Sequence, residues 1–168
     1  IAQWQAVGWA HEVMNTDNMS ILGITLDYGP FGFIDDYDPG FICNHSDHNG
    51  RYAFNQQPYI GLWNLSCLAQ ALLPLAEKED LKASLDRYTP VCERRYMELM
   101  RAKCGLIETK EEDASLIQDL LALMHLHHVD YTNFFRALSA FQTGSTSLNE
   151  PLRDFFLDRE AFDQWARR

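Results

Sequence analysis

Apolar positions repeat with a helical period over the last two thirds of the chain. After Gly61 they recur three and four residues apart, which is typical of amphipathic helices. The predicted helices cover the ranges 62–73, 81–88, 92–103, 117–124, 134–141 and 158–165. We expect Pro90 to interrupt the helical pattern, Gly105 to end the third helix and Asp158 to cap the last one.

The first third of the chain follows a different pattern. Apolar residues predict a buried helix over 1–14, and turn-forming residues follow it. Two short apolar runs, 19–22 and 24–26, flank Gly23 and predict a small hairpin. Residues 30–58 show neither period, and a loop of that length usually has a function. The expected fold is therefore mainly helical with one short β-hairpin.

The charge balance narrows the possible partners. The chain has 168 residues and a formal net charge of −10. An acidic protein without a basic face is a poor candidate for binding nucleic acid. Residues 1–50 contain seven carboxylates and no Lys or Arg, so that the first cation is Arg51. Such a region either repels phosphates or meets them through a metal ion.

Cysteine usage and hydropathy indicate a reducing compartment and no membrane span. The four cysteines form no C-x-x-C pair, which argues against a zinc site. The longest stretch without charged side chains, 52–76, contains Asn, Gln and Pro residues and does not resemble a membrane helix. No secretory signal opens the chain, which begins at Ile1 in a helix-like pattern. We interpret it as part of a longer cytoplasmic protein, or a mitochondrial one if the source is eukaryotic.

Asn18 and Asp27 form the strongest candidate site. They lie at the two ends of the predicted hairpin, which places them close together. An amide oxygen and a carboxylate can share one Mg²⁺ (or Mn²⁺) ion whose coordination is completed by phosphates and water. The alternative is that both are only turn residues.

The spacing around this pair matches part of the protein-kinase pattern. In kinases, H-R-D-x-x-x-x-N, a hairpin and D-F-G follow one another, and the Asn and the second Asp bind Mg²⁺. Here Asn18 follows His11 by the same seven residues, and Asp27-Tyr28-Gly29 follows the hairpin. Val13 occupies the position of the kinase catalytic Asp and cannot accept a proton. Asp17 is the only nearby carboxylate that could replace it, unless it is merely a turn or cap residue.

Long strings of this sequence resemble the selenoprotein O family, also called YdiU. The matching strings are HEVMNTDNMSILG over 11–23, DYGPFGF over 27–33, DDYDPGFICNHSD over 35–47, GRYAFNQQP over 50–58 and GLWNL over 61–65. The resemblance is dense over residues 4–73, whereas beyond about residue 75 only helical character agrees. One departure is Glu12, where family members usually have Gly.

The resemblance implies a fragment of a kinase-like C-lobe that lacks its N-lobe, with a protein adenylyltransferase as the parent enzyme. Such an enzyme transfers AMP from ATP to Ser, Thr or Tyr hydroxyls of protein substrates. The family pattern implies Asp17 as the general base and Asn18 and Asp27 as Mg²⁺ ligands, with Asp27 also near the nucleotide. Residues 1–27 would form the helix, catalytic loop and hairpin, 28–58 the activation segment and 59–168 the helical region.

The resemblance also gives Cys43 a possible redox role, because bacterial members can pair a Cys there with a C-terminal Cys. The acidic and histidine residues of 35–48 fit no metal motif and are expected to serve structure or substrate docking. His125, His127 and His128 are expected to be ordinary surface or core histidines. Alone, residues 1–168 are expected to bind ATP weakly and to be inactive, since the cations of an N-lobe are missing.

Two other functions stay open at this point. A divergent kinase would move the γ-phosphate of ATP, but Val13 argues against it. A non-catalytic helical interaction module would leave the anionic loop without a role.

Overall fold

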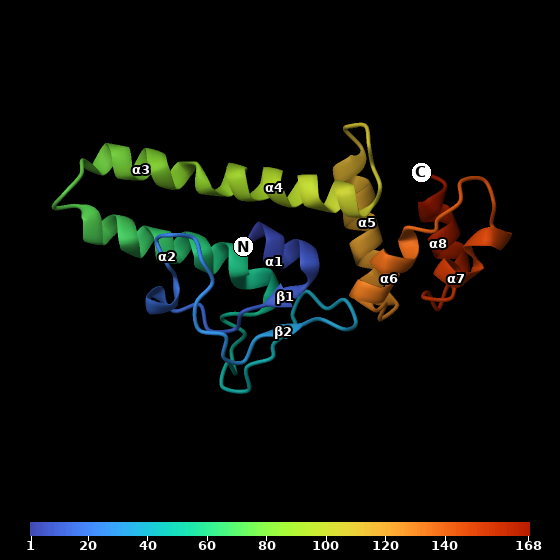
Figure 1. Ribbon diagram of the computed structural model, residues 1–168, viewed down its shortest axis with the longest axis horizontal. Coiled ribbons are helices and arrows are strands. Elements are labelled where there is room, and N and C mark those ends of the chain that lie inside the picture. The colour runs from blue at the N-terminus through green and yellow to red at the C-terminus, as the bar shows by residue number, and fades with distance from the viewer. The chain divides into compact units, whose positions relative to one another are not determined.

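The computed structural model describes all residues, 1–168, and the chain divides into two compact units (Figure 1). The first unit consists of residues 1–33 and 40–96, and the second of residues 34–39 and 97–168. Helix α4 (Tyr88–Lys103) contributes residues to both. The segment 30–58 is shared as well, because its residues 34–39 belong to the second unit.

The first unit combines helices with a long irregular segment. Its elements are α1 (Ala2–Val7), β1 (Trp9–Ala10), the short 3-10 helix η1 (Thr16–Asn18), β2 (Gly32–Phe33), a second 3-10 helix η2 (Phe54–Gln56), α2 (Gln57–Leu72), α3 (Lys78–Asp86) and the beginning of α4. Strand β1 pairs antiparallel with β2, with Trp9 opposite Phe33 and Ala10 opposite Gly32. Most of segment 30–58 is irregular, as the sequence predicts.

The prediction of one helix over residues 1–14 is wrong. Helix α1 ends at Val7 because Gly8 adopts a left-handed backbone with φ 70°. The chain continues as β1, and Trp9 and Ala10 are both buried. Their strand partner lies more than twenty residues away in the sequence, so a local hydrophobic period cannot distinguish this buried strand from a helix.

The predicted hairpin has less regular structure than expected. Residues 19–26 turn back on themselves through a single antiparallel bridge between Met19 and Thr25, without two strands. The side chains of Ile21 and Leu22 are 82% and 79% exposed, so they pack on no face of this unit. A two-stranded hairpin without a packed face is only marginally stable in water.

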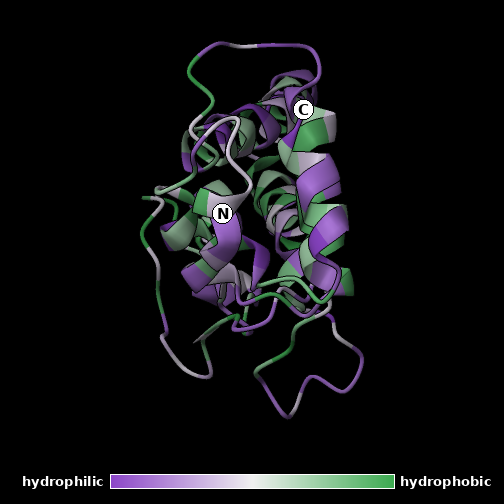
Figure 2. Ribbon diagram, turned by 90° about the vertical axis from the view of Figure 1, so that its right-hand side faces the viewer, coloured by the Kyte–Doolittle hydropathy of each residue, from purple (hydrophilic) through white to green (hydrophobic).

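The second unit has an aromatic core. It contains the end of α4, then α5 (Asp113–Leu126), α6 (Tyr131–Leu138), the 3-10 helix η3 (Ser147–Asn149), α7 (Glu150–Arg153) and α8 (Arg159–Ala166). Phe134, Phe156 and Phe162 are buried, and the Phe156 and Phe162 rings stack with centroids 4.9 Å apart. The helices carry both hydrophilic and hydrophobic residues (Figure 2).

Of the three predicted helix boundaries, those at Gly105 and Asp158 agree with the structure and the one at Pro90 does not. Gly105 has φ +72° and follows the last turn of α4, and the carboxylate of Asp158 accepts bonds from the amides of Glu160 and Ala161. Both of these predictions are confirmed. Pro90 does not interrupt a helix, because the break falls at Arg87 and Pro90 lies in the first turn of α4, where its missing N–H costs no helical hydrogen bond.

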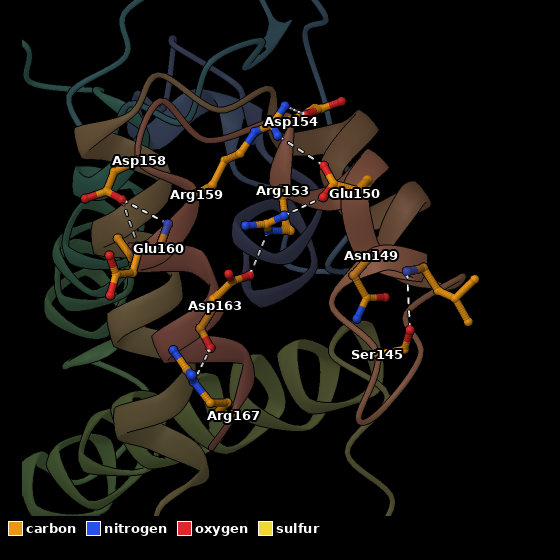
Figure 3. A network of polar contacts seen from close by, with 12 residues as sticks. Ser145, Asn149, Glu150, Arg153, Asp154, Asp158, Arg159, Glu160, Asp163 and Arg167 are labelled. Atoms are coloured by element: carbon orange, nitrogen blue, oxygen red, sulfur yellow. Dashed lines mark hydrogen bonds and ion pairs between the residues drawn. The ribbon is translucent and has the colours of Figure 1, made fainter.

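Several ion pairs lie at the surface of α7 and α8 (Figure 3). Arg153 lies 2.5 Å from Glu150 and 3.0 Å from Asp163, while Arg159 pairs with Glu150 and Asp154. None of the helices in the structure has the length and apolar character needed to cross a membrane.

Candidate functional site

Asn18 and Asp27 contact each other directly. The side-chain nitrogen of Asn18 donates to Oδ2 of Asp27 at 2.9 Å and to the carbonyl of Val13 at 2.9 Å. These two bonds use both amide protons and fix the orientation of the side chain. Oδ1 of Asn18 is therefore left as an acceptor beside the Asp27 carboxylate. The hairpin does bring the two side chains together, as their spacing predicts.

The backbone of Asp27 has an uncommon conformation. Its φ is 56°, and its carbonyl accepts a bond from the amide of Gly29 at 2.8 Å. Asp is among the few residues that tolerate the left-handed region, because its short polar side chain can hydrogen-bond locally. This turn directs the exposed carboxylate of Asp27 to the side where Asn18 lies.

The buried side chain of His11 links the backbone before Asn18 to the backbone before Asp27. Its side chain is 1% exposed, Nε2 lies 2.6 Å from the carbonyl of Leu26, and Nδ1 accepts from the amide of Val13 at 3.3 Å. A neutral imidazole with its proton on Nε2 satisfies both contacts. Since Leu26 precedes Asp27 and the Val13 carbonyl holds Asn18, His11 positions both candidate ligands.

Two buried amides of α2 hold the loop in place, and neither is among the residues predicted from the sequence. Gln57 is fully buried, accepts from the amide of His11 at 2.8 Å and donates to the carbonyl of Trp9 at 2.9 Å. Asn64 is 4% exposed and donates to the carbonyl of Met14 at 2.9 Å. They lie seven residues apart, two helical turns on one face, which is the signal that could have identified them.

Asp17 lies in η1, next to Asn18. Its side chain is exposed, and no hydrogen bond or ion pair holds its carboxylate. The loop that carries it is nevertheless anchored, because the hydroxyl of Tyr52 donates to the side chain of Asn15. The carboxylate is therefore open to solvent on a fixed backbone, as a proton acceptor must be.

Glu12 is the most unusual residue of the site region. It is fully buried at φ 65°, and neither carboxylate oxygen has a hydrogen-bond partner. Burial raises the pKa of Glu12 to about 7, and the charge of Asp47 adds to the shift. The nearby backbone amides of Cys43 and Asn44 lower the pKa in part, although neither forms a hydrogen bond of normal geometry with the carboxylate. The side chain of Asn44 donates to the Glu12 carbonyl at 3.1 Å. Glu12 therefore faces the loop that contains Cys43.

The Cys43 thiol is held in a contact that disfavours reaction. It donates to the carbonyl of Pro30 at 2.7 Å, and a Cβ on Gly32 would lie 3.3 Å from its sulfur. Burial, and then the charge of Glu12, raises the pKa of Cys43 to about 11. Because the thiolate is the reactive form, Cys43 reacts slowly at neutral pH in this conformation. Its redox role stays a prediction.

The other acidic and histidine residues of segment 30–58 form no metal site. No group of three or more His, Cys, Asp or Glu side chains in the structure is placed to hold an ion. Both carboxylate oxygens of Asp47 are occupied by the amides of Arg51 and Tyr52. In the second unit, Nδ1 of His125 lies 3.1 Å from the carbonyl of Tyr37, in line with an ordinary structural histidine.

Comparison with known proteins adds to this geometry. The family model described as "Protein adenylyltransferase SelO" matches residues 1–168. The chain belongs to the SelO family. Relatives named "Protein nucleotidyltransferase YdiU" are 61% identical in Myxococcus xanthus and 55% identical in Vibrio vulnificus, each over 168 residues and all of this chain. A third, from Thioalkalivibrio sulfidiphilus, is 58% identical over 98% of the chain.

The chain spans about a third of the length of these SelO-family relatives, 34% in each case. The strings that first suggested the family lie mostly in the first unit, which also contains the contact between Asn18 and Asp27. The family match extends to residue 168 and so includes the whole second unit, for which the sequence itself predicts only helical character.

Proposed function

We propose that this chain is the kinase-like C-lobe part of a protein adenylyltransferase that transfers AMP from ATP to a protein Ser, Thr or Tyr hydroxyl. The observation that carries the proposal is the 2.9 Å contact between Asn18 and Asp27, next to the exposed carboxylate of Asp17. This arrangement offers oxygen ligands and a proton acceptor side by side, in a chain of a family described by this activity.

Asn18 and Asp27 suit a magnesium ion. Mg²⁺ prefers a few protein oxygens and completes its shell with water and substrate phosphates. Oδ1 of Asn18 and the carboxylate of Asp27 are oxygen donors. The Asn18 amide nitrogen now donates to Oδ2 of Asp27, so an ion shared by the two side chains would replace that hydrogen bond, while the bond to the Val13 carbonyl can remain. When bound, the ion would neutralise negative charge on the phosphates of ATP.

Asp17 would act on the incoming hydroxyl. The hydroxyl oxygen forms a bond to the α-phosphorus of ATP, the bond from that phosphorus to the β-phosphate bridge breaks, and pyrophosphate leaves. The hydroxyl proton passes to the Asp17 carboxylate. Val13 offers no such acceptor, and its carbonyl is engaged by Asn18. His11 and Gln57 act indirectly, because they fix the backbone that carries the two candidate metal ligands, Asn18 and Asp27.

The test uses the full-length protein and ATP radiolabelled in either the α- or the γ-phosphate. We expect label on protein from the α-position only. Asp17→Asn should lower the rate by about 100-fold or more, the usual contribution of a general base. Asp27→Ala should abolish the Mg²⁺-dependent transfer. Asp86→Asn, which removes an exposed carboxylate of α3, is the matched control and should change neither.

Two results would overturn the proposal. One is transfer of label from the γ-phosphate, which would make the protein a kinase. The other is full activity in Asp17→Asn and Asp27→Ala proteins that retain the wild-type unfolding temperature.

A further inference from the structure

Arg51 rests on two aromatic rings at the surface of the first unit. Its guanidinium carbon lies 4.8 Å from the ring centroid of Trp63 and 5.7 Å from that of Tyr52. We call these three residues the arginine platform. Stacking of this kind holds a guanidinium by its face and leaves the N–H groups at its edge directed outward.

The charge of Arg51 has no counterpart in the structure. It is the only Lys or Arg between Ile1 and Glu77, a stretch with a clear excess of carboxylates. Its exposed side chain nevertheless forms no ion pair. Only the backbone amide of Arg51 meets a carboxylate, because it donates to Oδ1 of Asp47 at 2.9 Å. The aromatic rings, rather than an acidic partner, set its position.

The arginine platform borders the loop that carries Asp17. The Tyr52 hydroxyl donates to the side chain of Asn15, the residue just before η1. On the other side, Trp63 precedes Asn64, whose side chain donates to the carbonyl of Met14. Tyr52 therefore contacts a residue two positions before the candidate base, and Trp63 is the chain neighbour of the residue that holds the Met14 carbonyl.

From these contacts we propose that the arginine platform is a specificity site, which binds a carboxylate side chain of the protein substrate close to the hydroxyl that is modified. The proposal rests on the proposed function for its place in the reaction. A planar guanidinium with free edges matches a carboxylate in a two-bond geometry. It would also offset the repulsion between an acidic substrate segment and the nearby charge of Asp17.

Protein carboxylates suit Arg51 better than the phosphates of ATP. The proposed function assigns the phosphates to an ion held by Asn18 and Asp27. The side-chain contacts of Arg51 are with Tyr52 and Trp63, and it contacts neither of these two candidate ligands. An ATP contact would raise the KM for ATP when Arg51 is changed. A substrate contact would instead change only the affinity for acidic sequences.

The experiment measures binding and transfer separately in the full-length protein. The probes are two fluorescein-labelled alanine-rich peptides that contain one Ser, flanked by Glu in one peptide and by Gln in the other. Fluorescence anisotropy gives the affinity of each, and mass spectrometry detects AMP on the Ser. We expect wild type to bind the Glu peptide about fivefold more tightly, the effect of a well-oriented exposed ion pair.

Three variants sharpen the result. Arg51→Met should remove the preference for Glu and leave the KM for ATP unchanged. Arg51→Lys keeps the charge without the planar fork and should retain part of the preference. Arg94→Met removes an exposed arginine of α4 in the same unit and should behave like wild type.

Equal binding of both peptides by wild type, or an unchanged preference in Arg51→Met, would overturn the arginine platform as a specificity site. A rise in the KM for ATP in place of lost peptide preference would do the same. A Glu preference that depends on Arg51, found without any AMP transfer, would support the binding site and count against the proposed function.

Discussion

The loop region of the first unit and the aromatic core of the second unit are stabilised in different ways. Around Asn18 and Asp27, buried amides of α2 hold the backbone, and Glu12 and Asp27 adopt positive φ. In the second unit, phenylalanine rings pack against each other. Polar networks fix the direction of individual groups, whereas apolar packing supplies stability without fixing any polar atom. The region that carries the proposed chemistry is the one built from directed bonds.

The largest expected effect concerns the aromatic core. Phe134 is fully buried against Phe156 and Phe162, so Phe134→Ala should lower the free energy of unfolding by about 3–5 kcal/mol. Urea denaturation followed by circular dichroism measures the change. Leu157→Ala, at an 83% exposed position of the same unit, should change it by less than about 0.5 kcal/mol. Similar losses in both variants would contradict the assignment of the core.

The next effect is a pH dependence that comes from Glu12. Its pKa of about 7 in the folded protein lies above the ordinary 4.5, so between these values the folded chain keeps a proton that the unfolded chain has released. The free energy of unfolding should therefore fall as the pH rises from 4.5 to about 7 and stay level above that. The contribution of Glu12 to this fall is at most about 3 kcal/mol.

Urea midpoints measured from pH 5 to 8 test this pH dependence. Glu12→Gln should flatten the curve, and Glu77→Gln, at an exposed position, should leave it unchanged. Glu12→Gly should flatten the curve too. It should also raise the free energy of unfolding by about 1 kcal/mol, because glycine adopts positive φ without strain. A wild-type curve as flat as that of Glu12→Gln would show that the carboxyl ionises normally.

A smaller loss is expected when a directed bond is removed from the loop region. Gln57→Leu leaves the amide of His11 and the carbonyl of Trp9 buried without partners, at a cost of about 2 kcal/mol. Tryptophan fluorescence during urea unfolding measures it, since Trp4, Trp9 and Trp63 all lie in the first unit. Gln56→Leu is the matched control, because that amide bonds only the side chain of Asn55. Equal stability of the two variants would contradict a structural role for Gln57.

The smallest effect should come from the ion pairs of α7 and α8. Arg159 and its partners Glu150 and Asp154 are each about half exposed, so Arg159→Met should cost less than about 0.5 kcal/mol (Figure 3). Salt screens such pairs, and the difference from wild type should vanish in concentrated NaCl. A loss that persists at high salt would show that apolar packing of the Arg159 stem is responsible.

Local features of this chain could be predicted from the sequence, and features set by distant partners could not. The nearness of Asn18 and Asp27 depends on one short turn, and the cap of α8 depends on Asp158 and the two amides after it. The strand that follows α1 depends on the pairing of Trp9 with Phe33. Likewise, the role of Gln57 depends on His11, 46 positions earlier. A window of neighbouring residues contains neither partner.

The bond between the Cys43 thiol and the Pro30 carbonyl has a consequence for the chemical labelling of this cysteine. Because burial raises the pKa of the thiol and the Pro30 carbonyl engages it, we expect iodoacetamide to label Cys43 more slowly in the folded protein than in an unfolded chain. The rate at Cys43, distinguished from the other three free cysteines by peptide mass spectrometry, thus reports how often the thiol leaves the Pro30 carbonyl.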